Sequence, residues 1–119
     1  MIKEIYEKYG EFSDSWIEKI DISKDTVSLT LICANKMNSF KYEKILLELM
    51  LLEKIILNKN SYEDIIGIKD LLLKENENYI VMDLDPIDHF DYLKENPQSN
   101  FKIWCKDINY KFIEEYNTK

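Results

Sequence analysis

The chain contains no arginine, and all 16 of its basic residues are lysines. Binding to nucleic acid depends on clustered lysine and arginine, and arginine supplies most bidentate contacts to bases and phosphates. The 23 acidic residues outnumber the basic ones and give a formal net charge of -7. We therefore expect no binding to nucleic acid, and a basic protein is the more natural partner for so acidic a chain.

Glycine and proline are scarce as well, with two of each among 119 residues. Two glycines are too few for a glycine-rich loop that cradles phosphate, and the composition is not that of a low-complexity chain. There is one histidine and no Gly-x-Ser-x-Gly motif, so no set for nucleophilic catalysis can be recognised. Cys33 and Cys105 belong to no Cys-x-x-Cys pair, which predicts two reduced core thiols and no zinc site. We expect no cofactor.

Long apolar runs are also missing. The most apolar stretch, residues 45–57, is interrupted by Glu48, Glu53 and Lys54, and it is shorter than the roughly 20 residues that span a bilayer. The N-terminal residues lack the apolar region of a signal peptide. We therefore expect a cytoplasmic protein without a membrane partner. The length fits one domain over residues 1–119, and a hydrophobic content of 45% is enough for one core.

What the sequence does contain is alternation of apolar and polar residues. Residues 2–9 have helical spacing and predict a short amphipathic helix that ends at Gly10. Residues 15–23 and 26–34 alternate with a period of two and predict an antiparallel hairpin, with Trp16 on the core face. The next run, residues 43–58, is rich in good helix formers.

The run 43–58 leaves two interpretations open. On a helix its charged residues do not gather on one side, whereas on a strand its odd positions form an apolar face broken only by Glu53. We favour a long strand, or two strands around a kink near Glu53 and Lys54, over a helix. A second hairpin is predicted from residues 62–74 and 79–84, with Gly67 at a bulge or bend.

Residues 85–100 are expected to be irregular, and the last strand begins near Ser99. Its alternation changes phase at residues 106–107, as a β-bulge would produce. Together these patterns predict a mainly β fold, α+β at the margin. The expected architecture is an antiparallel curved sheet or half-barrel of about six strands with a short N-terminal helix.

An acidic loop, residues 83–92, is the most unusual local feature. It contains four aspartates, Asp83, Asp85, Asp88 and Asp91, together with Tyr92 and the only histidine, His89. The loop can be a solvated turn region, an acidic surface for a basic protein, or a metal or catalytic site, although its spacing matches no metal motif. Among these we favour a partner surface, with the four aspartates and Tyr92 as contacts. Trp104, flanked by Lys102 and Lys106, is either covered by another element or an exposed anchor for the partner.

The order of segments resembles a known group of proteins. The segments are DSWIEKIDI (14–22), TVSLTLIC (26–33), KILLELMLLEKIIL (44–57), YIVMDLDP (79–86) and SNFKIWCKDINYKF (99–112). This layout, over about residues 12–113, resembles small β-rich immunity proteins encoded beside polymorphic or contact-dependent bacterial toxins. The resemblance implies a cytoplasmic protein that is not an enzyme and that binds and blocks one cognate toxin domain. It carries over no functional residue, because such proteins use different surfaces from pair to pair.

We therefore expect a non-enzymatic binding protein that neutralises a basic, nuclease-like toxin domain, as a monomer or weak homo-oligomer. The alternative is a small ligand-binding or metal-dependent enzyme domain that uses the acidic loop and His89.

Overall fold

A computed structural model describes residues 2–58, 66–89 and 92–116 of the protein, except for the side chains of Ile66 and His89. The elements, in chain order, are α1 (Ile2–Tyr9), β1 (Ser15–Ile22), β2 (Thr26–Asn35), the short 3-10 helix η1 (Lys36–Asn38), β3 (Lys41–Leu57), β4 (Ile66–Ile68), β5 (Leu72–Glu75), β6 (Ile80–Asp83), β7 (Ile87–His89), β8 (Tyr92–Lys94) and β9 (Phe101–Glu115).

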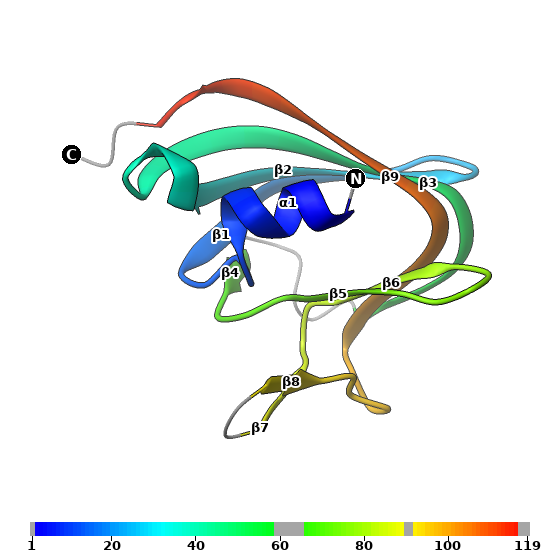
Figure 1. The fold of residues 1–119 in the computed structure, drawn as a ribbon. Helices are drawn as coiled ribbons and strands as arrows, with labels where there is room; N and C mark the ends of the chain where they lie inside the picture. The colour runs from blue at the N-terminus through cyan, green and yellow to red at the C-terminus, as the bar shows by residue number, and fades with distance from the viewer. Residues whose placement is uncertain (1, 59–65, 90–91, 117–119) are drawn as a thin grey trace.

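Seven strands form one antiparallel sheet in the order β4-β1-β2-β3-β9-β6-β5, and β7 pairs with β8 in a separate two-stranded sheet. The large sheet curls into a half-barrel, and α1 lies inside the curve (Figure 1). The prediction of a mainly β, antiparallel half-barrel with a short N-terminal helix is confirmed. Within the described residues, no helix has the length and apolar character needed to cross a membrane.

The core lies on the inner face of the curled sheet. Alternate residues of β2 and β3 point inward and are fully buried, among them Leu29, Leu31 and Leu47. The inward face of α1 contributes Ile5 and Tyr9, which close the curve from the open side. Burial of apolar area at roughly 25 cal/mol per Å² is what keeps this eight-residue helix docked, because a helix so short is marginal alone.

Residues 41–57 form a strand, which confirms the favoured interpretation of this run. The strand pairs with β2 over residues 41–50 and with β9 over residues 43–57. This pairing and the packing of its apolar face override helix propensity. Where the alternative of two strands placed a kink, the strand is continuous, and its register with β9 shifts by one residue between Leu52 and Lys54. The extra residue, Glu53, is thereby turned outward, where it forms an ion pair with Lys106 at 3.1 Å.

The phase shift at residues 106–107 is present, but its expected cause is wrong. Cys105 and Ile108 are both buried on the inner face, while the register of β9 with β3 continues unshifted from Asp107 to Cys105. No bulge is needed, because β3 changes face at the same place. Leu51 there has a left-handed backbone (φ 55°), and the two strands turn together.

Two further expectations are corrected. Trp16 does not join the core, because a register shift after Ile17 puts Ile17 inward and Trp16 outward. The Trp16 ring lies 5.7 Å from that of Tyr42 and 5.5 Å from that of Tyr116 on the outer face. The stretch 85–100 is not wholly irregular, since it contains β7 and β8. The described residues thus hold nine strands where about six were expected, and the additional ones are short.

Both cysteines are free and buried, as predicted. Burial raises the pKa of the Cys33 thiol, with the nearby carboxylate of Glu43 adding to the shift. Burial likewise raises the pKa of Cys105, to about 11. Neither thiol is therefore poised as a nucleophile at neutral pH.

Candidate functional site

One end of the half-barrel is organised by a buried carboxylate, Glu43, which is only 4% exposed. It lies on the inner face of β3 near the start of the strand, where the alternation turns odd positions inward. The hydroxyl of Tyr9 donates to one oxygen of Glu43 at 3.0 Å, and the amide of Asn35 donates to the other at 2.9 Å. Glu43 therefore joins the last residue of α1 to the last residue of β2.

The hydroxyl of Tyr9 stays protonated in this setting. Burial raises its pKa well above the ordinary value, and the hydrogen bond to Glu43 adds to the shift. A protonated phenol is the donor that the buried carboxylate needs, because an unpartnered buried charge is costly.

Asn35 in turn holds the connection between β2 and β3. Its side-chain oxygen accepts a hydrogen bond from the backbone N–H of Met37 at 2.8 Å, which caps η1. Ser39 and Phe40 follow in left-handed conformations, with φ of 52° and 59°. Such a backbone costs a non-glycine residue roughly 1–2 kcal/mol. The strained turn nevertheless leaves Met37 68% exposed and Phe40 65% exposed.

The segment after α1 is also sharply turned. Gly10 ends the helix with φ 59°, as its sequence predicts, and Asp14 has φ 58°. The hydroxyl of Tyr42 donates to the backbone oxygen of Asp14 at 3.0 Å, which ties the segment to β3. The hydroxyl of Ser13 donates to Asp70 at 2.7 Å, which ties it to the residues before β5.

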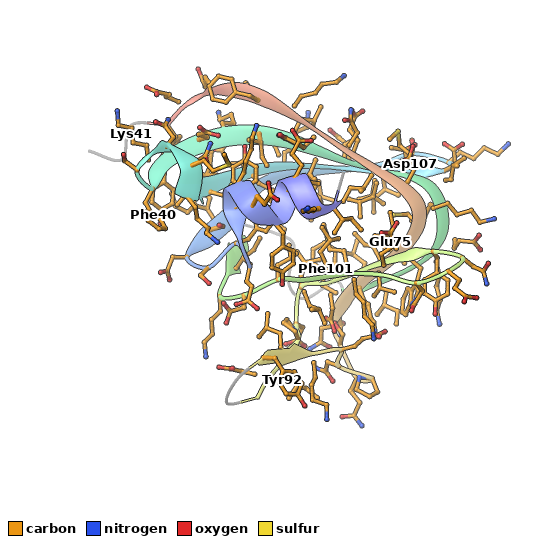
Figure 2. All side chains as sticks on the ribbon, viewed as in Figure 1. Phe40, Lys41, Glu75, Tyr92, Phe101 and Asp107 are labelled. Atoms are coloured by element: carbon orange, nitrogen blue, oxygen red, sulfur yellow. The ribbon has the colours of Figure 1, made fainter. Side chains whose placement is uncertain are left out.

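Between these two turned segments lies an open hollow of about 520 Å³, which we call the cup. Its lining comes from α1, the segment after α1, the end of β2, η1 and the start of β3, and consists of Tyr6, Tyr9, Gly10, Glu11, Ser13, Asp14, Ala34, Lys36, Phe40 and Tyr42. Figure 2 shows Phe40 at this end of the molecule, far from Tyr92 on β8. The cup thus combines four aromatic rings with two carboxylates.

The two acidic residues of the cup differ from several other acids in the part of the chain that the structure describes. Neither Glu11 nor Asp14 places its carboxylate in a hydrogen bond or ion pair with any of the described residues, whereas Glu18, Glu48 and Glu53 each pair with a lysine. Tyr6 has a raised pKa because it is partly buried and because the negative charge of Glu11 adds to the effect of burial. Aromatic faces and unpaired carboxylates both attract cations.

The acidic loop is built differently, around Asp83, which is fully buried. One carboxylate oxygen accepts from the hydroxyl of Ser99 at 2.7 Å and the backbone N–H of Asp85 at 2.9 Å. The other oxygen accepts from the backbone N–H of Asn96 at 2.7 Å. Asp83 therefore fixes the connection between β6 and β9 from inside. Asp83 was predicted to contact a partner, but in this conformation its side chain is not on the surface.

Trp104 is half-buried on the outer face of β9. The Nζ atoms of Lys54 and Lys102 each lie 5.0 Å from the centre of its ring. Lys102 is 5% exposed and forms an ion pair with Glu95. Trp104 is thus partly exposed, and neither of its two alternatives, cover by another element or an exposed anchor, is decided by these contacts. Its role as an anchor stays a prediction.

The other predicted contacts are scattered. Asp85 is half-buried and accepts a hydrogen bond from the backbone N–H of Asn100 at 3.3 Å. Asp88 on β7 is exposed, and Tyr92 on β8 is 56% exposed. Asp91 lies outside the described residues. Among the described residues, the acidic loop thus combines one internal carboxylate, Asp83, with the half-buried Asp85 and a small exposed hairpin.

The rival hypothesis of a metal or catalytic site drew on the same loop. Within the described part of the chain, no three His, Cys, Asp or Glu side chains gather closely enough to hold a metal ion. The His89 side chain and Asp91 lie outside that part, so their use in a site stays a prediction.

The cup was not foreseen from the sequence. The available signal was two pairs of aromatic residues, Tyr6 with Tyr9 just before Gly10, and Phe40 with Tyr42 just after the segment 35–39. The long-range hydrogen bonds of Glu43 and the bond from Tyr42 to Asp14 hold these pairs together, and no local pattern encodes them.

The chain was compared with protein-family models, with curated proteins and with solved structures. None of these comparisons finds a match.

Proposed function

We propose that this chain is a non-enzymatic, cytoplasmic binding protein that attaches to a basic protein and blocks it. This is the activity of the immunity proteins that its segment order resembles, and a nuclease-like toxin domain is the partner class they imply. The observation that carries the proposal is the cup, an open hollow lined by aromatic residues and by two acidic residues whose carboxylates have no partner among the described residues.

The charge of the chain supports the same function. With a net charge of -7, the protein attracts a basic partner over a distance, which accelerates encounter. Exposed Phe40 in the lining of the cup, together with exposed Met37 on η1, provides apolar contact area of the kind that holds a complex after encounter. Electrostatic steering and apolar anchoring thus meet at one end of the molecule.

The test uses the protein encoded beside this chain in its genome, expressed and purified separately. The two proteins should form a complex whose affinity falls as the salt concentration rises, because exposed charge pairs are screened. The activity of the neighbouring protein should be lost in the complex. A neighbour that is basic and toxic but neither binds nor loses activity would contradict the proposal.

A further inference from the structure

The lining of the cup allows its occupant to be specified more closely, provided that the proposed function is correct. We propose that the cup receives an arginine side chain of the basic partner, and that Lys36 is the resident cation which this arginine must displace.

The first argument is the chemistry of the walls. A guanidinium group stacks on aromatic faces and pairs with carboxylates through two parallel hydrogen bonds, whereas an ammonium group is a compact and more strongly hydrated charge. The lining of the cup includes the half-buried Tyr6 and Tyr42 and the exposed Phe40 as aromatic residues. Glu11 and Asp14 are acceptors in the same lining. Both kinds of contact are therefore available to one planar cation.

The second argument is that the acceptors are unused. Within the described residues, the carboxylates of Glu11 and Asp14 have neither a hydrogen-bond donor nor an ion-pair partner. Exposure alone does not explain this, because most of the ion pairs elsewhere include a side chain that is more than half exposed. By contrast, Tyr42 donates to the backbone oxygen of Asp14 and leaves the side chain free. The carboxylates of Glu11 and Asp14 can therefore accept hydrogen bonds from a group of a binding partner.

The third argument concerns Lys36. Its side chain runs along the wall formed by Gly10, where a Cβ atom would lie only 3.2 Å from Lys36 Cδ and 3.6 Å from Lys36 Nζ. The absence of a side chain at Gly10 therefore leaves room for Lys36 in the cup. Lys36 is exposed, and it forms no ion pair within the described residues. The positive charge of Lys36 repels a second cation that enters the cup. Lys36 therefore opposes binding until its side chain moves out of the cup.

The experiment is a titration of the ¹⁵N-labelled protein, followed by NMR, with acetyl-Gly-Arg-Gly-amide and separately with acetyl-Gly-Lys-Gly-amide. The arginine peptide should shift the amide signals of residues 10–14 and 36–42 and bind about threefold or more tightly than the lysine peptide, given the added stacking and bidentate contact. Equal binding of the two peptides would overturn the assignment to arginine. Shifts confined to residues 85–94 would overturn the assignment to the cup.

Variants separate the roles of the walls. Glu11→Gln combined with Asp14→Asn should weaken the arginine peptide by about tenfold, since two charge-assisted contacts are lost. Asparagine tolerates the left-handed backbone at residue 14, so the fold is retained. Lys36→Gln should strengthen binding about twofold to fivefold, while Lys24→Gln at the exposed β1–β2 turn, with the same change in net charge, should leave it nearly unchanged. Equal effects of the two lysine variants would refute the role of Lys36.

The same variants with the neighbouring basic protein distinguish the two proposals. If that protein binds the chain but neither peptide occupies the cup, the proposed function stands and the arginine assignment fails. If the neighbouring protein does not bind, the proposed function fails whatever the peptides do.

Discussion

The cup and the acidic loop are each assembled on one buried carboxylate, Glu43 in the first and Asp83 in the second. Both carboxylates accept hydrogen bonds that hold segments far apart in the sequence. The difference lies in the acids around them. In the loop, Asp85 also accepts an internal hydrogen bond, whereas the Glu11 and Asp14 carboxylates in the lining of the cup have no partner among the described residues. The number of acids in a segment is thus a poor guide to a binding surface, because what matters is whether their acceptors are already used.

The largest effect should come from Asp83→Asn. The amide removes the charge and keeps one acceptor oxygen, so its NH2 group faces either the N–H of Asn96 or the two donors from Asp85 and Ser99. We expect a loss of about 3 kcal/mol in the free energy of unfolding, measured by chemical denaturation. The matched control is Asp88→Asn on exposed β7, which should change stability by less than about 0.5 kcal/mol. Equal losses in the two variants would show that the loop is not built on Asp83.

A smaller loss is expected from Tyr9→Phe. The variant keeps the ring in the core but leaves Glu43 with Asn35 as its remaining donor. Removing one partner of a buried carboxylate should cost about 2 kcal/mol of unfolding free energy. Tyr79→Phe, at an exposed tyrosine near the β5–β6 turn, is the control and should be close to neutral. If Tyr9→Phe is also neutral, Glu43 does not depend on α1 for its hydrogen bonds.

The pH dependence of stability should show whether the buried hydroxyl of Tyr9 contributes to the stability of the fold. The pKa of Tyr9 is raised in the folded state, chiefly by burial. Its contribution to stability is therefore complete below the ordinary tyrosine pKa of about 10 and is lost as the pH rises above that value. Denaturation series from neutral to alkaline pH should show this decline, and Tyr9→Phe should make it less steep. An equal slope in both proteins would mean that another group controls the alkaline loss.

Much of the fold could be predicted from the sequence, because alternation is a local signal. It identified the hairpin of β1 and β2, the strand nature of residues 43–57 and the short helix ended by Gly10. Trp16 was misplaced because one extra residue after Ile17 reverses the face of the strand, and nothing in the pattern marks that insertion. A comparable change of face occurs within β3 at Leu51, which has a left-handed backbone, and the alternation does not mark it either.

The candidate site was harder to predict than the fold. The sequence drew attention to the aspartates of the acidic loop because they stand close together along the chain. The cup brings together residues 6–14 and 34–42, and its geometry depends on bonds between those segments. A fully buried aspartate such as Asp83 cannot be told from a surface one by its neighbours in sequence.

The most direct test of the account compares two double variants in calorimetric titration with the basic protein encoded beside this chain. Each variant neutralises two carboxylates, Glu11→Gln with Asp14→Asn in the cup, and Asp85→Asn with Asp88→Asn in the acidic loop. If the cup is the binding site, the first variant should lose about tenfold in affinity, equivalent to about 1.4 kcal/mol, and the second less than about twofold. A larger loss of affinity in the loop variant would contradict the account and would indicate that the partner binds the acidic loop.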